Sequence, residues 1–217
     1  MLSRAMTKTD PTEAKALFNR ALEMCLLLAL PAAIALAIIP NQLIGTLFER
    51  GAFDAADTTT TATVLMAYAL GLPAYIAIKV FSTAHWARQD TLIPVKISII
   101  ATITNIILSL ILIQFIGVAG IALGTGITGW MQFIMHIRAL KTHPAATFDK
   151  KFKHNLPRIV LSTAAMAAIL YALTHITPNG LLGLALLVTT GLITYAIGIL
   201  TTNVIKTSDI KKYLVKG

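Results

Sequence analysis

The stretch of sequence that decides the fold is residues 97–137, ISIIATITNIILSLILIQFIGVAGIALGTGITGWMQFIMHI, which contains no charged residue across 41 positions. A helix needs about 20 apolar residues to cross a bilayer, so this run is about twice the spanning length. Residues 117–120, Gly-Val-Ala-Gly, lie at its middle and are typical of a tight turn. The stretch therefore predicts a hairpin of two transmembrane helices.

Three further charge-free runs flank this hairpin, at residues 24–48, 58–78 and 159–205. The first two each have the length of one membrane-spanning helix. The third contains residues 177–180, Thr-Pro-Asn-Gly, where proline removes a backbone donor and Asn-Gly favours a turn, so we expect it to divide into two helices. The sequence predicts six transmembrane helices and an all-α fold, because barrel strands would appear as short alternating segments instead.

The composition agrees with a polytopic membrane protein. Hydrophobic residues make up 56% of the 217 residues and charged residues only 12%, with a net charge of +9. Soluble domains carry about 25% charged residues, and disordered chains have low hydrophobicity, so both classes are disfavoured. The basic residues lie between long uncharged runs rather than along one folded face, and we expect no nucleic-acid partner. The single cysteine, Cys25, excludes an intrachain disulfide.

The positions of lysine and arginine predict the orientation. Sixteen of the eighteen basic residues fall in the N-terminal segment, the second and fourth loops and the C-terminal tail, whereas the first, third and fifth loops together carry only Arg50. The remaining one, Lys79, lies inside the second predicted span. By the positive-inside rule, we expect both termini to be cytoplasmic.

These features divide the chain into five parts. Residues 1–23 are expected to be a cytoplasmic amphipathic lead-in that could lie at the membrane surface, because Phe18 and Leu22 recur at helical spacing. Residues 24–140 would form four transmembrane helices, and residues 141–158 a basic cytoplasmic loop. Residues 159–205 would form the last two transmembrane helices, and residues 206–217 a basic cytoplasmic tail.

Several short motifs occur in order along the first spans: LFERGAF at residues 47–53, YALGLP at 68–73, ARQDT at 87–91 and PVKI at 94–97. Together with Lys79 and Asn105, they resemble the MurJ (MviN) family, lipid II flippases of the multidrug/oligosaccharidyl-lipid/polysaccharide exporter superfamily. The resemblance covers about residues 20–140. Beyond that, only the pattern of a basic loop, two apolar helices and a basic tail is similar.

The resemblance implies the C-terminal portion of a flippase with fourteen helices, here helices nine to fourteen. Such a protein translocates lipid II, the undecaprenyl-linked peptidoglycan precursor, across the bacterial inner membrane by alternating access. The last two helices would form a groove for the lipid tail, and the central headgroup cavity would belong largely to a missing N-terminal half. The resemblance also implies dependence on membrane potential rather than ATP. Two alternatives stay open, a related polysaccharide-lipid exporter and a non-transporting scaffold or inert truncation.

Two basic residues are candidate functional residues. An intramembrane charge such as Lys79 is by default a functional hypothesis, here contact with an anionic lipid headgroup. However, Lys79 lies six residues before His85, about 9 Å along a helix, so its side chain could also snorkel to the cytoplasmic interface as an anchor. Arg88, in the second loop, is a gate candidate that would pair with an acid in the missing half. Asp90, close by, is expected to cap the next helix.

Three polar residues are candidates for a cation site. Asn105 and Ser109 are four residues apart on one face of the third span, and Thr125 lies in the next helix. Their oxygens could coordinate sodium, but interhelical hydrogen bonding explains the same residues, and no carboxylate is present in either span.

No motif indicates an enzyme. The five histidines show no HExxH spacing and there is no Walker-type loop, so we expect no catalytic residue, no metal site and no bound cofactor.

Overall fold

The computed structural model describes residues 11–141 and 147–204. It contains six long helices, namely α2 (Pro11–Ile38), α4 (Ala55–Ala87), α5 (Leu92–Ile116), α6 (Val118–Leu140), α7 (Lys150–Thr174) and α8 (Leu181–Thr201). Each is long and apolar enough to cross a membrane. A shorter helix, α3 (Pro40–Phe48), follows α2. The expected six spans and the all-α fold are confirmed for the described part of the chain, which holds no strand.

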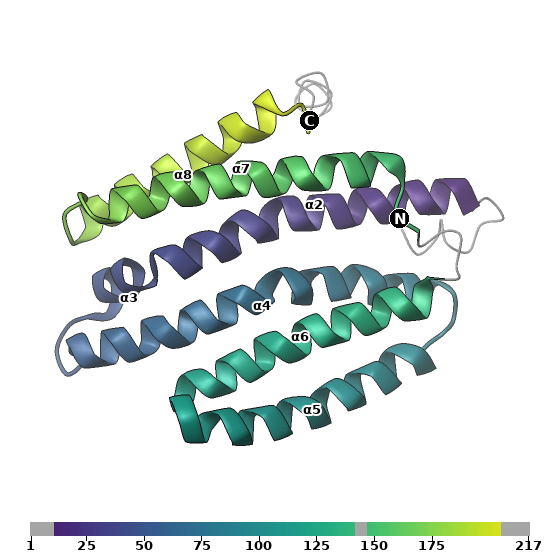
Figure 1. The fold of residues 1–217 in the computed structure, drawn as a ribbon, viewed down its shortest axis with the longest axis horizontal. Coiled ribbons are helices and arrows are strands. Elements are labelled where there is room, and N and C mark those ends of the chain that lie inside the picture. The colour runs from purple at the N-terminus through teal and green to yellow at the C-terminus, as the bar shows by residue number, and fades with distance from the viewer. Residues whose placement is uncertain (1–10, 142–146, 205–217) are drawn as a thin grey trace.

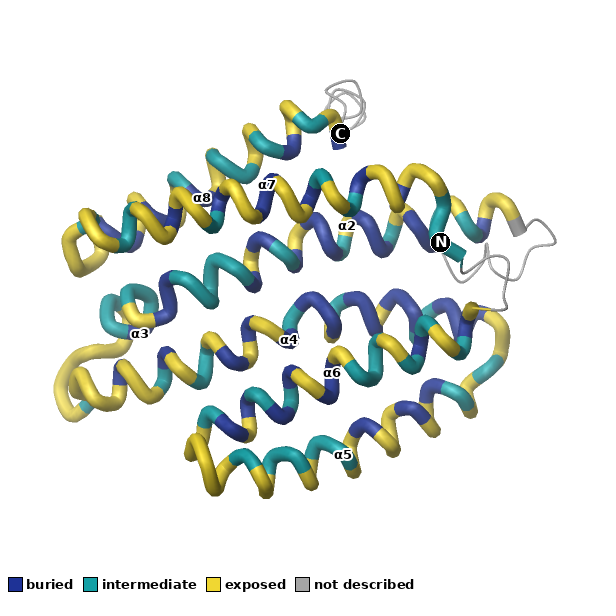
Figure 2. Tube along the Cα trace, viewed as in Figure 1, coloured by how far each residue is buried: buried dark blue, intermediate teal, exposed yellow. Residues whose placement is uncertain are grey.

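Helices α5, α6, α4, α2 and α7 lie side by side in that order, and α8 passes behind α7 in this view and also contacts α2 (Figure 1). Helix α4 packs against α2 and α6, α5 packs mainly on α6, and α7 joins α2 to α8. Most faces of α5 are exposed, as Figure 2 shows. Lipid tails are as apolar as the surfaces of these helices, so the hydrophobic effect does not drive the helices together. Van der Waals packing and interhelical hydrogen bonds hold them in place instead.

The two ends of the bundle differ in charge. The helix ends that carry Lys15, Arg88, Lys96, Arg138 and Lys150 lie at one end, called the basic end below (Figure 1). At the opposite end lie α3, the start of α4 and the α7–α8 turn; this end is called the α3 end.

The lead-in segment does not lie apart from the bundle. From Pro11 onward it is continuous with α2, and Phe18 and Leu22 are buried in a cluster with residues of α4 and α7. The rings of Phe18 and Phe81 meet edge to face at 5.2 Å. Its apolar face is therefore used in packing against α4 and α7. The expected position at the membrane surface stays a prediction.

The first predicted span is broken. The run 24–48 was expected to be one helix, but α2 ends at Ile38 and α3 starts at Pro40. Pro40 has no backbone N–H to continue the ladder, and Ile39 bridges the two helices by donating to Ala35 O and accepting from Leu43 N, each at 3.0 Å. Pro31 stays inside α2 without ending it.

The expected basic loop is shorter than residues 141–158. Helix α7 starts at Lys150, because the Asp149 side chain accepts from Phe152 N at 2.6 Å and caps the helix. Asn19 of α2 anchors this start by accepting from Asp149 N at 3.0 Å. One turn further on, Asn155 donates to the buried Glu23 at 2.8 Å. The tail at residues 206–217 lies outside the described residues.

Candidate functional site

Lys79 lies on an exposed face of α4, within the predicted span. It forms no ion pair with any carboxylate in the described ranges. Its backbone carbonyl accepts from the Thr83 hydroxyl at 2.8 Å, so the helix continues regularly toward the basic end. The Lys79 ammonium is therefore available on a face of α4 that neither α2 nor α6 covers.

The α4–α5 loop fixes Asp90 and leaves Arg88 exposed. Ile93 N donates to Asp90 Oδ1 at 3.2 Å, so Asp90 satisfies a backbone N–H at the start of α5 from one position before the N-cap residue, which is Thr91. Asp90 Oδ2 accepts from His85 Nδ1 at 3.3 Å. Partial burial raises the pKa of Asp90, but the hydrogen bonds from Ile93 and His85, with the nearby Arg88 charge, outweigh burial and lower it overall. Arg88 itself ends α4 and pairs with no described carboxylate.

A buried histidine pair lies behind this loop. His85 of α4 and His136 of α6 are both fully buried, with ring centroids 5.4 Å apart. Nε2 of His85 and both ring nitrogens of His136 have no hydrogen-bond partner in the part of the chain that the structure describes. Sequence reasoning tested histidines for local spacing only and missed this pair. The available signal was the direction of the helices: α4 and α6 are two spans apart and run the same way, so His85 and His136 fall at the same end.

The structure brings Asn105, Ser109 and Thr125 together between α5 and α6. Ser109 Oγ donates to Asn105 Oδ1 at 2.8 Å, and Asn105 Nδ2 donates to Thr125 Oγ1 at 3.2 Å. The Thr125 hydroxyl in turn donates to Ile121 O at 2.9 Å. The Thr125 carbonyl also accepts from Tyr75 of α4 at 3.0 Å, so the network links three helices. The geometry accounts for these residues as an interhelical hydrogen-bond network.

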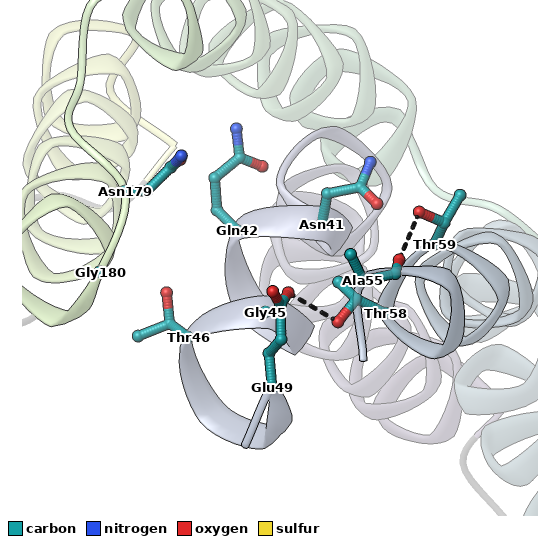
Figure 3. A pocket seen from close by; sticks show the side chains of 10 residues that line it. All are labelled: Asn41, Gln42, Gly45, Thr46, Glu49, Ala55, Thr58, Thr59, Asn179 and Gly180. Carbon is teal, nitrogen blue, oxygen red and sulfur yellow. Dashed lines mark hydrogen bonds between the residues drawn. The ribbon is translucent and has the colours of Figure 1, made fainter. Parts of the chain in front are cut away.

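A polar pocket opens at the α3 end, with a volume of about 460 Å³. We call it the α3 pocket; it is lined by Asn41, Gln42, Gly45, Thr46, Glu49, Ala55, Thr58, Thr59, Asn179 and Gly180. Figure 3 shows these side chains converging from α3, the start of α4 and the α7–α8 turn. The Thr58 hydroxyl donates to Glu49 Oε2 at 2.9 Å and holds the carboxylate in place. The LFERGAF motif contributes Glu49 to this pocket, and the α7–α8 turn, far away in sequence, contributes Asn179 and Gly180.

An apolar groove runs between α2, α7 and α8, with a volume of about 220 Å³. We call it the α8 groove; its lining is Leu28, Pro31, Ala32, Ala35, Ile39, Met166, Leu170, Leu187, Val188, Gly191, Leu192 and Tyr195. Tyr195 is the polar exception, and its hydroxyl donates to Leu27 O at 2.6 Å. A Cβ on Gly191 would meet the Leu170 side chain at 3.3 Å, so the small residue lets α8 pack closely against α7 at this point of the groove.

Residues 1–191 match the sequence profile of the family described as lipid II flippase MurJ. The chain belongs to the MurJ family. It is 31% identical over 199 residues to a probable lipid II flippase MurJ of Rhizobium tropici, which covers 86% of this chain and 37% of the relative. It is 35% identical over 170 residues to the corresponding protein of Rhizobium meliloti, covering 78% of this chain and 32% of the relative.

A solved structure of lipid II flippase MurJ in an inward closed conformation is similar to this fold, with a TM-score of 0.79 and 29% sequence identity. The match covers 91% of this chain and 40% of that chain. The chain thus spans about a third of the length of the MurJ relatives that it matches.

MurJ proteins are transporters rather than enzymes. With six membrane-spanning helices and this family membership, the chain is a multi-pass protein of the bacterial inner membrane.

Proposed function

We propose that this chain is the C-terminal portion of a lipid II flippase and contributes the last six helices to a transporter that moves lipid II across the inner membrane. The observation that carries the proposal is the family match over residues 1–191, joined to a structural match that covers most of this chain but only 40% of the solved flippase. The remaining helices, including those of the headgroup cavity, would come from an N-terminal half. Family membership favours this function over a polysaccharide-lipid exporter or an inert scaffold.

The α8 groove is the proposed binding site for the polyprenyl tail of lipid II. Its lining is apolar apart from the Tyr195 hydroxyl, which already donates to a backbone carbonyl. An apolar chain in this groove would leave no described polar group without a partner. Surrounding membrane lipids would compete for the same surface, so the groove provides a place for the tail rather than specificity for the headgroup.

Lys79 is the proposed contact for an anionic headgroup. Its exposed ammonium on α4 has no described carboxylate partner, so a phosphate oxygen could accept from it without breaking an existing ion pair. Snorkelling to the interface is the competing role, and charge-conserving and charge-removing variants separate the two.

Arg88 and the Asn105 network have proposed roles that need the N-terminal half. Exposed Arg88 would pair with an acid of that half when the basic end closes. For sodium, Asn105, Ser109 and Thr125 would supply neutral oxygens, with any compensating charge coming from the other half. In both proposals the membrane potential drives the transport cycle, and no bound cofactor is needed.

The proposed orientation places the basic end and both termini in the cytoplasm, which the charge distribution supports. Complementation tests the proposed function. In a strain depleted of its flippase, this chain expressed with an eight-helix N-terminal half should restore growth, and the chain alone should not. Failure of the combined halves, with both inserted and associated, would contradict the proposal.

A further inference from the structure

The α3 pocket is polar, acidic and separate from the residues discussed for transport. Its polar lining combines amides and hydroxyls with one carboxylate, and neither lysine nor arginine lines it. The pocket therefore offers no cationic side chain to bind a phosphate group. Ligands that match such a lining are rich in hydroxyl, amide and ammonium groups, such as sugars and peptides.

Most of these polar groups are free to bind. Among the described residues, the side chains of Asn41, Gln42, Thr46 and Asn179 make no hydrogen bond to protein. By contrast, Glu49 is positioned, because Thr58 fixes one carboxylate oxygen and leaves the other available as an acceptor. An ordered carboxylate surrounded by free amides is suited to an ammonium or hydroxyl donor.

The pocket also adjoins the α8 groove. Ile39 lines the groove, and Asn41, two residues later, lines the pocket. On the other wall, Gly180 lines the pocket at the start of α8, and Leu187 lines the groove two turns further on. Leu43 of α3 packs on the cluster that contains the groove residues Ile39 and Leu187, so α3, which lines the pocket, also contacts the residues of the groove. An amphiphile with its tail in the groove would present its polar head to the α3 pocket.

We propose that the α3 pocket binds the sugar–peptide part of the lipid II headgroup at the α3 end, with Glu49 accepting from its ammonium or hydroxyl groups. This inference rests on the proposed function, because it needs a lipid tail in the α8 groove. Because no basic residue lines the pocket, we expect it to hold the sugar–peptide part rather than the pyrophosphate.

Lipid titration followed by native mass spectrometry tests the proposal on the purified full chain. The two probes are lipid II and undecaprenyl pyrophosphate, which shares the tail and pyrophosphate but lacks the sugar–peptide part. The parent chain should bind lipid II more tightly. Glu49→Gln keeps an oxygen for the Thr58 hydroxyl, and should weaken lipid II binding about tenfold while leaving undecaprenyl pyrophosphate unchanged. Thr46→Val should weaken lipid II binding in the same selective way, by a smaller factor.

Two matched variants provide controls. Glu13→Gln removes an exposed acid at the opposite end of α2, and Thr60→Val removes an exposed hydroxyl of α4 outside the pocket; both should bind like the parent. Equal affinity of the parent for both lipids, or equal weakening of both by Glu49→Gln, would overturn the pocket proposal and leave the tail groove intact. A parent that binds neither lipid would overturn the tail groove together with this inference, whereas the proposed function is tested separately by complementation with both halves.

Discussion

Gly71 of α4 and Gly126 of α6 touch backbone to backbone: a Cβ added at Gly71 would lie 2.7 Å from the Gly126 Cα. Small residues at such crossings let two transmembrane helices approach closely and pack. Further along the same two helices, His85 of α4 lies against His136 of α6, with ring centroids 5.4 Å apart.

Gly71→Ala should destabilise the bundle by about 1–3 kcal/mol, because the new methyl group meets backbone that cannot move aside. Thermal unfolding in detergent measures the effect. Gly45→Ala is the matched control, since its Cβ would meet only side-chain atoms, the flexible end of Glu49 at 3.3 Å and the Thr58 methyl group at 3.5 Å. If Gly71→Ala unfolds at the parental temperature, the close crossing is not what holds α4 and α6 together.

Asn155→Leu should destabilise the α2–α7 contact by about 1–3 kcal/mol, because it removes the amide that donates to the buried Glu23. Combining it with Glu23→Leu should recover part of the loss, since no buried acceptor is then left without a donor. Chemical unfolding of the single and double variants gives the coupling free energy between Asn155 and Glu23. Simple additivity of the two losses would rule out this hydrogen bond as the link.

Stability should fall in acid through Asp90. The folded pKa of Asp90 lies below its ordinary value of 3.8, so its carboxylate contributes stability above that pH and loses it as pH falls through the lower folded value. Asp90→Asn should therefore flatten the dependence of unfolding temperature on pH below 3.8. A parent and variant with parallel acid profiles would show that Asp90 is not responsible.

Cysteine labelling should confirm the orientation. In a Cys25→Ala background, single cysteines at Asp54 and Asn179 should react with an impermeant reagent from the periplasm, and those at Lys151 and Lys212 only after the cells are opened. The charge bias toward one side of the predicted spans motivates this expectation. Labelling at Lys151 in intact cells would refute it.

Lys79→Ala should slow transport in the assembled flippase if the ammonium contacts an anionic headgroup, and Lys79→Arg should keep part of the rate. Transport normalised to inserted protein is the measurement. If the alanine variant transports at the parental rate, Lys79 is an anchor only.

The six spans were predictable from sequence because a bilayer requires about 20 apolar residues per crossing, and charge-free runs record this directly. The break at Ile39 was not, since proline is tolerated within transmembrane helices: Pro31 and Pro73 leave theirs intact, whereas Pro40 starts a new one. Which outcome occurs depends on packing of α3 against α4 and α8.

Candidate residues were predictable where the interacting side chains lie close together in sequence. Asn105 and Ser109 share a helix face by spacing alone, and Thr125, grouped with them from the sequence, hydrogen-bonds to Asn105 in the structure. The histidine pair and the α3 pocket were missed because they join helices far apart in sequence, such as α3 and the α7–α8 turn.

Lipid II translocation in reconstituted vesicles tests the central claim most directly. The account predicts that this chain alone moves no lipid II, because the headgroup cavity belongs to the N-terminal half, and that both halves reconstituted together translocate it. Translocation by this chain alone, or none by the associated halves, would contradict the account.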